Sequence, residues 1–470
     1  MDLSKIKHIF VLMLENRSFD HMLGFSGIPG IDGLVGQSRS NRDAVGEPVA
    51  PTPDADYAGD YDDDPGHDFE DVQVQLYGTR SPPPGQQPDM SGFVKSYADK
   101  YGLNPTESHR VMSCFSPDKL PVLVTLAKQF AVCDQWFSSL PGPTLPNRLY
   151  THSGTSGGRL DMSPEYFTGF RTIFEVLDEA STPRYPKGVP ATIYCDGWTA
   201  AATFNYLLKY QQQFFGTLED FYSDCAGSEE DVPAYCFLEP RYSSGMVGET
   251  FFPQNDQHPD SDVRQGEKLI YRVYQAIRKN KKLWESSILL ITYDEHGGLY
   301  DHVPPPACDA PDDKPGDLGF DFKRLGVRVP TVLVSPYINP GTVSHIQFDH
   351  TSLISTVRKL LTGVWQDNVL GVRAGKANTF DASEILNRDT PRPDDVYIPT
   401  VVPPTPSQDD VDLSVLQSFH LKQAIALNQT LPPDKRINTD PHTIKTSQRV
   451  DVYLRNVFAA ATGARGGQSR

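Results

Sequence analysis

Two short acidic clusters could carry chemistry, because each directly follows an apolar run. Glu15 and Asn16 open the first cluster, and Asp294 and Glu295 open the second. Carboxylate and amide oxygens are the ligands that hard divalent cations such as Mg²⁺, Ca²⁺ or Mn²⁺ prefer. A single acidic pair of this kind is typical of a solvated strand end. Two such pairs, each at the end of an apolar run, favour a shared metal site.

A proline-rich segment presents one hydroxyl residue, Thr144, between Pro143 and Pro146. Proline fixes the backbone on either side, so we expect the Thr144 side chain to face a ligand. The residues after Pro146 can begin a helix, whose N-terminus attracts anions. A threonine hydroxyl beside a metal can ionise and attack phosphorus. The simpler alternative is a proline-rich turn with a capping threonine.

Two histidines, His67 and His258, lie in polar loops rather than in apolar runs. A role in proton transfer and simple exposure to solvent are equally compatible with such a position. Four other histidines adjoin predicted turns or helix caps, which favours structural roles for them; they are His21, His296, His302 and His350.

The elements that must position these residues alternate between strands and helices. Six apolar runs bounded by turn residues predict buried strands at 6–15, 130–134, 191–196, 234–239, 287–294 and 329–336. Helical periodicity covers 261–280, and a second helix is predicted from an N-cap at Asp349 to a stop at Gly363. This alternation predicts an α/β fold with a central, mostly parallel sheet flanked by helices. Ligands bind at the carboxyl ends of the strands in such sheets, which is where both acidic clusters fall.

Two loop-rich stretches suggest the domain organisation. Residues 46–90 are rich in Pro, Asp and Gly and predict a long surface loop. A second proline-rich break at 391–406 separates the last part of the chain, which has helical periodicity at 413–427. We therefore expect a catalytic domain at 1–390 and, at 391–470, a proline-rich linker with a helical C-terminal extension.

Charge and composition restrict the possible partners. The net charge of −17 excludes binding of nucleic acid through phosphate neutralisation and permits at most peripheral membrane contact. No apolar run approaches the about 20 residues of a membrane span, and no signal peptide is recognised. These features predict a soluble, cytoplasmic protein, or a secreted one if a leader has been removed. The six cysteines show no metal-binding spacing and are expected to be buried thiols rather than a disulfide framework.

The end of the chain differs from the rest in charge. Basic residues outnumber acidic ones after Pro433; they are Lys435, Arg436, Lys445, Arg449, Arg455, Arg465 and Arg470. The apolar stretch at 450–458 has two interpretations: it lies on a membrane surface, or it packs on the catalytic domain.

Several segments together resemble a known family. They are Glu15 to His21, Thr144 to Thr155, His258-Pro259 and Ile291 to His302, in order along about 1–360. These segments are similar to the phosphoesterase family of bacterial phospholipases C and acid phosphatases, and within it to the non-specific phospholipases C. The resemblance implies an alkaline-phosphatase-like fold with Thr144 as the nucleophile. It also implies a divalent cation (Ca, Mg, Mn or Zn) whose ligands come from Glu15, Asn16, Thr144, Asp294 and Glu295.

The same resemblance implies that Asn16, His67 and His258 contact the phosphoryl group or the leaving oxygen. The expected reaction is metal-assisted hydrolysis of a phosphoester through a phosphothreonine intermediate. The expected substrates are glycerophospholipids, cleaved to diacylglycerol and a phosphorylated head group. Two alternatives stay open: a phosphomonoesterase of the acid phosphatase type, and a non-catalytic protein that binds phosphate or metal in the same pocket.

Overall fold

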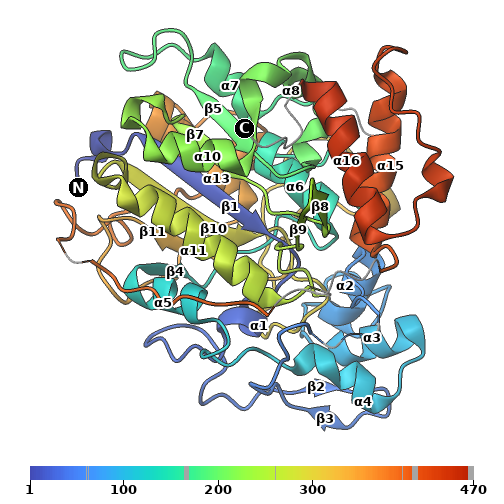
Figure 1. Ribbon diagram of the computed structural model, residues 1–470. Helices are drawn as coiled ribbons and strands as arrows, with labels where there is room; N and C mark the ends of the chain where they lie inside the picture. Colours follow the sequence, from blue (N-terminus) through green and yellow to red (C-terminus); the bar gives the residue numbers. More distant parts are fainter. Residues whose placement is uncertain are drawn as a thin grey trace.

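The centre of the protein is an eight-stranded sheet in the order β12-β4-β11-β10-β1-β7-β5-β6 (Figure 1). The computed structural model describes residues 1–59, 61, 63–163, 169–259, 261–393, 395–404 and 411–463. The strands of this sheet are β1 (His8–Leu14), β4 (Ala131–Cys133), β5 (Ala191–Tyr194), β6 (Phe215–Gly216), β7 (Tyr235–Leu238), β10 (Ser287–Tyr293), β11 (Val332–Val334) and β12 (Thr342–Ser344). Only β11 runs against its neighbours, so the sheet is mostly parallel, as predicted.

All six predicted strands are confirmed, and two further strands extend the sheet at its edges. β6 is Phe-Gly and β12 is Thr-Val-Ser, so neither short segment contains an apolar run. The two longest strands, β1 and β10, pair in parallel from His8 with Ser287 to Leu14 with Tyr293. Because both strands end together, the residue that follows each of them, Glu15 or Asp294, emerges at the same edge of the sheet.

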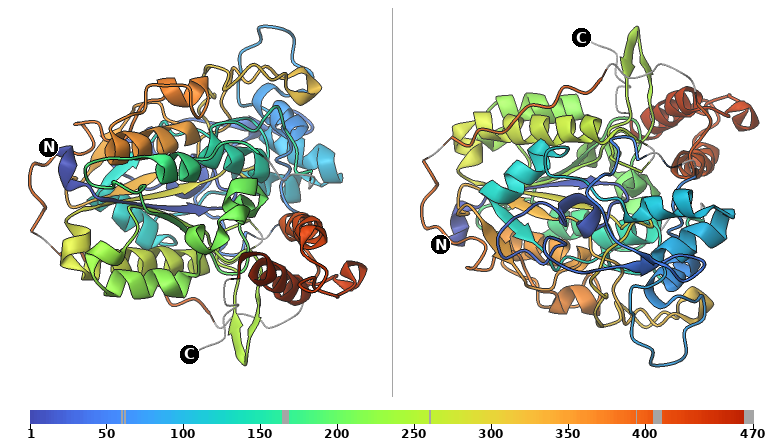
Figure 2. Two further views of the ribbon diagram at one scale, coloured as in Figure 1. Left: turned by 90° about the horizontal axis from the view of Figure 1, so that it is seen from above. Right: turned by 90° about the horizontal axis from the view of Figure 1, so that it is seen from below.

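Helices cover both faces of the sheet (Figure 2). On one face lie α5 (Pro121–Gln129), α10 (Leu218–Ala226) and α11 (Val263–Lys279), and on the other lie α6 (Thr144–Ser153), α7 (Ile173–Glu179) and α13 (His350–Thr362). Covering both faces explains why every residue of β1 and of β10 is buried and why these runs are continuously apolar. The predicted helices at 261–280 and after Asp349 are confirmed, with Asp349 as N-cap and Gly363 in the left-handed conformation. The predicted α/β class is therefore confirmed.

The prediction of a long surface loop over 46–90 is wrong for part of that stretch. Within it lies α2 (Phe69–Tyr77), which packs on α3 (Phe93–Tyr101) around a second, smaller core. Val72, Leu76 and Tyr77 of α2 are buried in that core. Sequence patterning missed α2 because it is short and its apolar partners come from Leu34, from residues 90–114, and from Tyr300 and Val327.

The C-terminal part forms two helices, α15 (Val415–Thr430) and α16 (Ser447–Thr462), which pack on each other. The predicted periodicity at 413–427 is thereby confirmed. Val450, Tyr453, Leu454, Val457 and Phe458 are buried, so this apolar stretch packs within the protein rather than on an external surface. Arg465 and Arg470, and residues 394, 405 and 406 of the proline-rich break, lie outside the described residues. The domain boundary at 390 stays a prediction.

The remaining elements are short. The helices are α1 (Phe19–Leu23), α4 (Pro105–Ser108), α8 (Asn205–Lys209), α9 (Gln211–Phe214), α12 (Lys281–Trp284) and α14 (Val372–Lys376). Two small antiparallel pairs are β2 (Asn41–Arg42) with β3 (Pro48–Val49), and β8 (Gly245–Val247) with β9 (Thr250–Phe252). The six cysteines are free thiols, five of them buried, and Cys308 is half-buried. In the part of the chain that the structure describes, no helix combines the length and the apolar character that a membrane span needs.

Candidate active site

Thr144 is the first residue of α6, and its hydroxyl faces the first acidic cluster. Its Oγ1 lies 3.3 Å from Oε2 of Glu15 and 3.2 Å from Oδ1 of Asn16, so the hydroxyl can donate to either acceptor. The N-cap of α6 is Pro143, which has no side-chain capping bond, so Thr144 does not act as a cap. The predicted helix is present but begins at Thr144, before Pro146 rather than after it, and the structure brings Thr144 together with Glu15 and Asn16 as expected.

The loop before Thr144 is held by Asn147, one helical turn further on. The Asn147 side chain accepts a hydrogen bond from the Leu140 amide at 3.1 Å and donates to the carbonyls of Gly142 at 2.9 Å and Pro143 at 3.1 Å. These bonds fix the backbone that leads into the hydroxyl. No sequence pattern marks Asn147 for this role.

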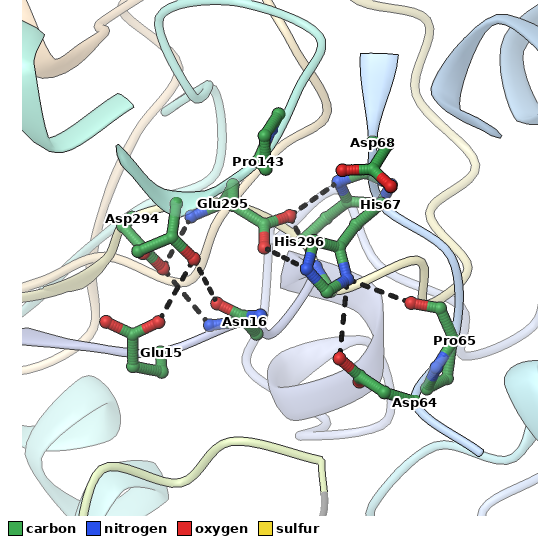
Figure 3. Close-up of polar contacts among 12 residues, drawn as sticks. Glu15, Asn16, Asp64, Pro65, His67, Asp68, Pro143, Asp294, Glu295 and His296 are labelled. Carbon is green, nitrogen blue, oxygen red and sulfur yellow. Dashed lines mark hydrogen bonds and ion pairs between the residues drawn. The ribbon is translucent and has the colours of Figure 1, made fainter. Parts of the chain in front are cut away.

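The two acidic clusters meet through a sharp turn at Asn16 (Figure 3). Asn16 has a φ of 55°, a left-handed conformation that asparagine tolerates better than most residues. In this turn the backbone amide of Asn16 donates to Oδ1 of Asp294 at 3.1 Å. The same Oδ1 also accepts from the backbone amide of Glu295 at 2.8 Å. Gly297 makes the close approach possible, because a Cβ there would lie 2.2 Å from the Asn16 carbonyl oxygen. Strand pairing and these turns therefore place Glu15, Asn16, Asp294 and Glu295 side by side.

Arg148 lies among the acidic groups and was missed by sequence reasoning. Its guanidinium contacts Oε1 of Glu15 at 2.5 Å, Oε2 of Glu239 at 2.6 Å and Oδ2 of Asp294 at 3.2 Å. Glu239 follows β7 and was likewise missed. Helical spacing was an available signal, because residues four apart share one face of a helix and Arg148 follows Thr144 by four.

Carboxyl groups outnumber guanidinium groups at this buried site. Four carboxyl side chains here are 0% exposed: those of Glu15, Glu239, Asp294 and Glu295. The guanidinium of Arg148 contacts the first three of them. Burial raises the pKa of Glu15 well above its usual value although Arg148 opposes this, and Asp294 raises the pKa further. Buried carboxylates are expected to be paired or to coordinate a metal. The donors present therefore fit a hard divalent cation.

His67 and His258 both reach this site from the loops where the sequence places them. Nε2 of His67 lies 4.0 Å from Oε1 of Glu295, and the two imidazole rings are 6.5 Å apart between centroids. The His67 side chain is 12% exposed and that of His258 is 1% exposed, which argues against simple solvent exposure.

The charges around His67 outweigh its burial. Burial lowers the pKa of His67, but Glu295 and Asp64 outweigh burial and raise it above the usual value. For the carboxyl group of Glu295 the directions are reversed. Burial raises its pKa, but the charge of His67 and hydrogen bonds from His296 and Gly297 outweigh burial and lower the pKa below its usual value.

Two of the four other histidines, His296 and His350, contact residues of the site. His296 contacts Oε2 of Glu295 through Nδ1 at 3.3 Å and Oε1 of Gln75 through Nε2 at 2.7 Å. His350, the first residue of α13, bonds the Asp294 carbonyl through Nε2 at 2.6 Å. His21 is buried against Phe115, where burial holds its pKa well below the usual value.

A second acidic group lies beside this site but is already neutralised. In the described part of the chain, one group of three potential metal-ligating side chains has all its ligand atoms within 4.8 Å of one another. The group consists of Asp20, Asp301 and His302. Arg328 pairs with Asp20 at 3.1 Å and with Asp301 at 2.9 Å, and His302 pairs with Asp20 at 2.6 Å. These ion pairs tie Asp20 of α1 to Arg328 and to the segment that holds Asp301 and His302.

The C-terminal helices lie on the side of the protein toward which β1 points (Figure 1). There they contact the segment that leads to His258. Nε2 of Gln417 in α15 donates to Oε1 of Gln254 at 3.2 Å, and Nε2 of Gln254 donates to both carboxylate oxygens of Asp256. Oδ1 of Asp256 accepts from the His258 amide at 3.1 Å. A continuous chain of hydrogen bonds therefore joins α15 to His258.

Comparison with known proteins agrees with this chemistry. The model of the Phosphoesterase family matches residues 6–362. Over 449 residues the chain is 37% identical to non-specific phospholipase C6 of Arabidopsis thaliana, covering 90% of this chain and 81% of that protein. Over 448 residues it is 28% identical to phospholipase C B of Mycobacterium tuberculosis (strain ATCC 25618 / H37Rv), covering 83% of this chain and 81% of that protein.

Similarity to solved structures is weaker. A protein in the alkaline phosphatase superfamily from Vibrio parahaemolyticus matches 56% of this chain and 65% of its own, at 13% identity and a TM-score of 0.32. The fold assignment therefore depends on the sheet itself. The sheet and the family match define a phosphoric ester hydrolase. The chain belongs to the Phosphoesterase family, which confirms the resemblance drawn from its motifs.

Proposed function

We propose that the protein is a phospholipase C that cleaves glycerophospholipids to diacylglycerol and a phosphorylated head group, with Thr144 as nucleophile. The observation that carries this proposal is the contact of the buried Thr144 hydroxyl with Glu15 and Asn16 at the start of α6. The names of the relatives, non-specific phospholipase C6 and phospholipase C B, support the substrate class.

The ligands proposed for a divalent cation are the oxygens of Glu15, Asn16, Thr144, Asp294 and Glu295. The gathering of three fully buried carboxyl groups, those of Glu15, Asp294 and Glu295, supports this assignment. The oxygen donors suit Ca²⁺, Mg²⁺, Mn²⁺ or Zn²⁺. Such a cation would favour ionisation of the Thr144 hydroxyl and offset charge on the phosphoryl oxygens.

The proposed reaction has two displacements at phosphorus. In the first, the ionised Oγ1 of Thr144 bonds to phosphorus while the bond to the glycerol oxygen breaks, and His258 gives that oxygen a proton. Asn16 and His67 bind the phosphoryl oxygens, where charge develops. In the second, water adds its oxygen to phosphorus and returns a proton to His258, and the bond to Oγ1 breaks.

A matched pair of variants tests the nucleophile. Thr144→Val keeps the shape of the side chain but lacks the hydroxyl, and Thr144→Ser keeps the hydroxyl. We expect Thr144→Val to fold normally and to lose turnover of phosphatidylcholine, and Thr144→Ser to retain measurable turnover. Acid quenching of the wild-type reaction should trap phosphate on the peptide that contains residue 144. Near-normal turnover by a folded Thr144→Val variant would refute the assignment.

Comparing diester with monoester substrates on one preparation tests the substrate class. We expect phosphatidylcholine to be hydrolysed with a higher kcat/KM than glycerol phosphate. The reverse order would indicate a phosphomonoesterase with the same nucleophile.

A further inference from the structure

Three neighbouring strands of the sheet each end in a buried carboxylate. β10, β1 and β7 are adjacent in the sheet (Figure 1), and the residues that directly follow them are Asp294, Glu15 and Glu239. β10 and β1 end together, whereas β7 ends opposite Leu12, two residues before the end of β1. Because a strand rises about 3.3 Å per residue, Glu239 leaves the sheet about 7 Å below the level of the other two carboxylates.

Both carboxylate oxygens of Glu239 are occupied by groups of the protein. Oε1 accepts a hydrogen bond from the Thr199 hydroxyl at 2.9 Å. Oε2 accepts from Nη1 of Arg148 at 2.6 Å and from the Tyr242 hydroxyl. A carboxylate with this set of donors is suited to holding Arg148 rather than to binding a metal ion itself.

Arg148 connects Glu239 to the proposed metal ligands. Each nitrogen of the guanidinium meets a different carboxylate: Nη1 contacts Glu239, Nη2 contacts Glu15 at 2.5 Å and Nε contacts Asp294 at 3.2 Å. The ring of Tyr242 lies beside the same group, with its centroid 5.4 Å from the guanidinium carbon. The guanidinium is planar and its donors point in fixed directions, so the bond at Nη1 helps to determine what the other two nitrogens reach.

The charge of Arg148 has two opposite effects on a metal site. It holds Glu15 and Asp294 in place, yet it competes with a cation for the same carboxylates. A negative charge on the far side of the guanidinium reduces this competition, because charges a few ångströms apart interact strongly in a poorly hydrated interior. Glu239 supplies that charge, since it is 0% exposed and bonds directly to Nη1.

We propose that Glu239 is a positioning residue that holds and neutralises Arg148, so that Glu15 and Asp294 are aligned for a divalent cation and keep their charge available to it. This inference rests on the metal site proposed above. Glu239 touches neither the cation nor the substrate in this proposal, and it acts through Arg148. Its loss should therefore weaken metal binding more than it slows turnover at saturating metal.

Binding of Mn²⁺ to the metal-free, full-length protein, measured by isothermal titration calorimetry, provides the test. For Glu239→Gln, which has nearly the same shape, we expect the Kd for Mn²⁺ to rise about 10- to 100-fold, the usual effect of losing a group that orients metal ligands. On phosphatidylcholine, kcat should stay within about threefold of wild type once Mn²⁺ is saturating. The Mn²⁺ concentration that gives half the maximal rate should rise by the same factor as the Kd.

A second variant separates positioning from charge. Tyr242→Phe keeps the ring beside Arg148 and the charge of Glu239, but it removes one of the hydrogen bonds that fix the Glu239 carboxylate. We expect the Kd for Mn²⁺ to rise several-fold, in the same direction as for Glu239→Gln.

Glu229→Gln is the matched control. Glu229 precedes β7 and pairs at 2.9 Å with Lys7, which precedes β1. This pair lies at the opposite ends of the same two strands, so its loss should leave the Kd for Mn²⁺ unchanged. Thermal unfolding of each variant checks that the fold is retained. If Glu239→Gln does not fold, Glu239→Asp, whose shorter side chain holds Arg148 less closely, is measured in the same way and should also bind Mn²⁺ more weakly.

The failures of the two proposals are distinguishable. A wild-type protein that binds neither Mn²⁺ nor another divalent cation would overturn the metal site, and the inference on Glu239 with it. If the wild type binds Mn²⁺ and a folded Glu239→Gln variant has the same Kd, the role of Glu239 alone is overturned. A wild-type Kd for Tyr242→Phe would also overturn the positioning role, because it would leave only a long-range effect of charge.

Discussion

Thr144 and Arg148 bind the two oxygens of the same carboxylate. Oγ1 of Thr144 lies 3.3 Å from Oε2 of Glu15, and Nη2 of Arg148 lies 2.5 Å from Oε1. Both residues belong to α6 and are one turn apart, so the helix itself sets the spacing between the Thr144 hydroxyl and the Arg148 guanidinium. The orientation of Glu15 therefore depends on α6, and the position of α6 depends on the carboxylates that Arg148 binds.

Removal of the Arg148 charge should destabilise the protein. Arg148→Met keeps much of the side-chain volume but leaves Glu15, Glu239 and Asp294 without their shared partner. Breaking a buried ion pair on one side costs about 3–5 kcal/mol, and we expect a loss of that order in the free energy of unfolding. Urea unfolding of the two proteins at pH 7 measures it. An unchanged midpoint would show that the guanidinium is not needed to hold the carboxylates.

Added divalent cation should offset part of this loss, because it would neutralise the same carboxylates. Arg272→Met is a suitable control, because Arg272 pairs with Glu219 at the surface, where its side chain is 49% exposed. Exposed pairs contribute about 0–1 kcal/mol, so this control should unfold close to wild type with or without cation.

Loss of one proposed metal ligand should lower metal content and turnover together. Glu15→Gln and Asp294→Asn keep the shape of each side chain and remove one negative charge from a site with few other ligands. We expect each variant to bind less divalent cation by elemental analysis and to lose most of its activity. Chelation of the wild-type protein should have the same effect, reversed by added cation. Full activity after exhaustive chelation would contradict the proposed metal.

Much of this site was predictable because its residues follow strands. Glu15 and Asp294 were found because the apolar runs before them are long and end in turns, and in a parallel pair such ends meet at one edge. Thr144 was found because prolines flank it. In each case a local pattern identifies the residue, and a general rule of sheet topology brings the residues together.

Residues that act through distant contacts were not predictable in this way. No sequence pattern marks Asp64 as part of the site, because His258, which lies 3.5 Å from it, comes almost two hundred positions later. Glu239 ends a predicted strand, yet nothing in its neighbourhood shows that Arg148 will pair with it. The helix α2 was hidden for the same reason, since its apolar face needs a core built largely from other segments.

A buried carboxylate away from the site should make stability depend on pH. Glu267 in α11 accepts hydrogen bonds from the amides of Val122 at 2.6 Å and Leu123 at 3.1 Å, and burial raises its pKa to about 8 although these bonds lower it. The folded state therefore holds this proton more tightly than the unfolded state does. The stabilisation is complete below a pH of about 4.5 and is lost as the pH rises through about 8.

Glu267→Gln removes this titration and should flatten the pH dependence of the free energy of unfolding. We expect the wild-type protein to lose up to a few kcal/mol relative to the variant between pH 5 and 8.5, from about 1.4 kcal/mol per unit of pKa shift. Urea unfolding of both proteins across this range measures the difference. Parallel curves would mean that Glu267 is ionised in the folded protein throughout.

The preference for lipid head groups should follow the overall charge. The net charge of −17 repels anionic lipid over a screening length of about 8 Å at physiological salt. The described tail offers little to counter this repulsion, because Arg455 is paired with Asp451 at 2.5 Å and the apolar stretch of α16 is buried. We expect phosphatidylcholine and phosphatidylethanolamine to be cleaved faster than phosphatidylserine and phosphatidylglycerol at equal surface density. The four exposed basic residues Lys435, Arg436, Lys445 and Arg449 form the competing surface. Changing these four residues together to Gln should leave the order of the cleavage rates unaltered. The contrary result would be a wild-type preference for anionic vesicles at low salt that the variant loses. That result would show that the local basic surface overrides the global charge.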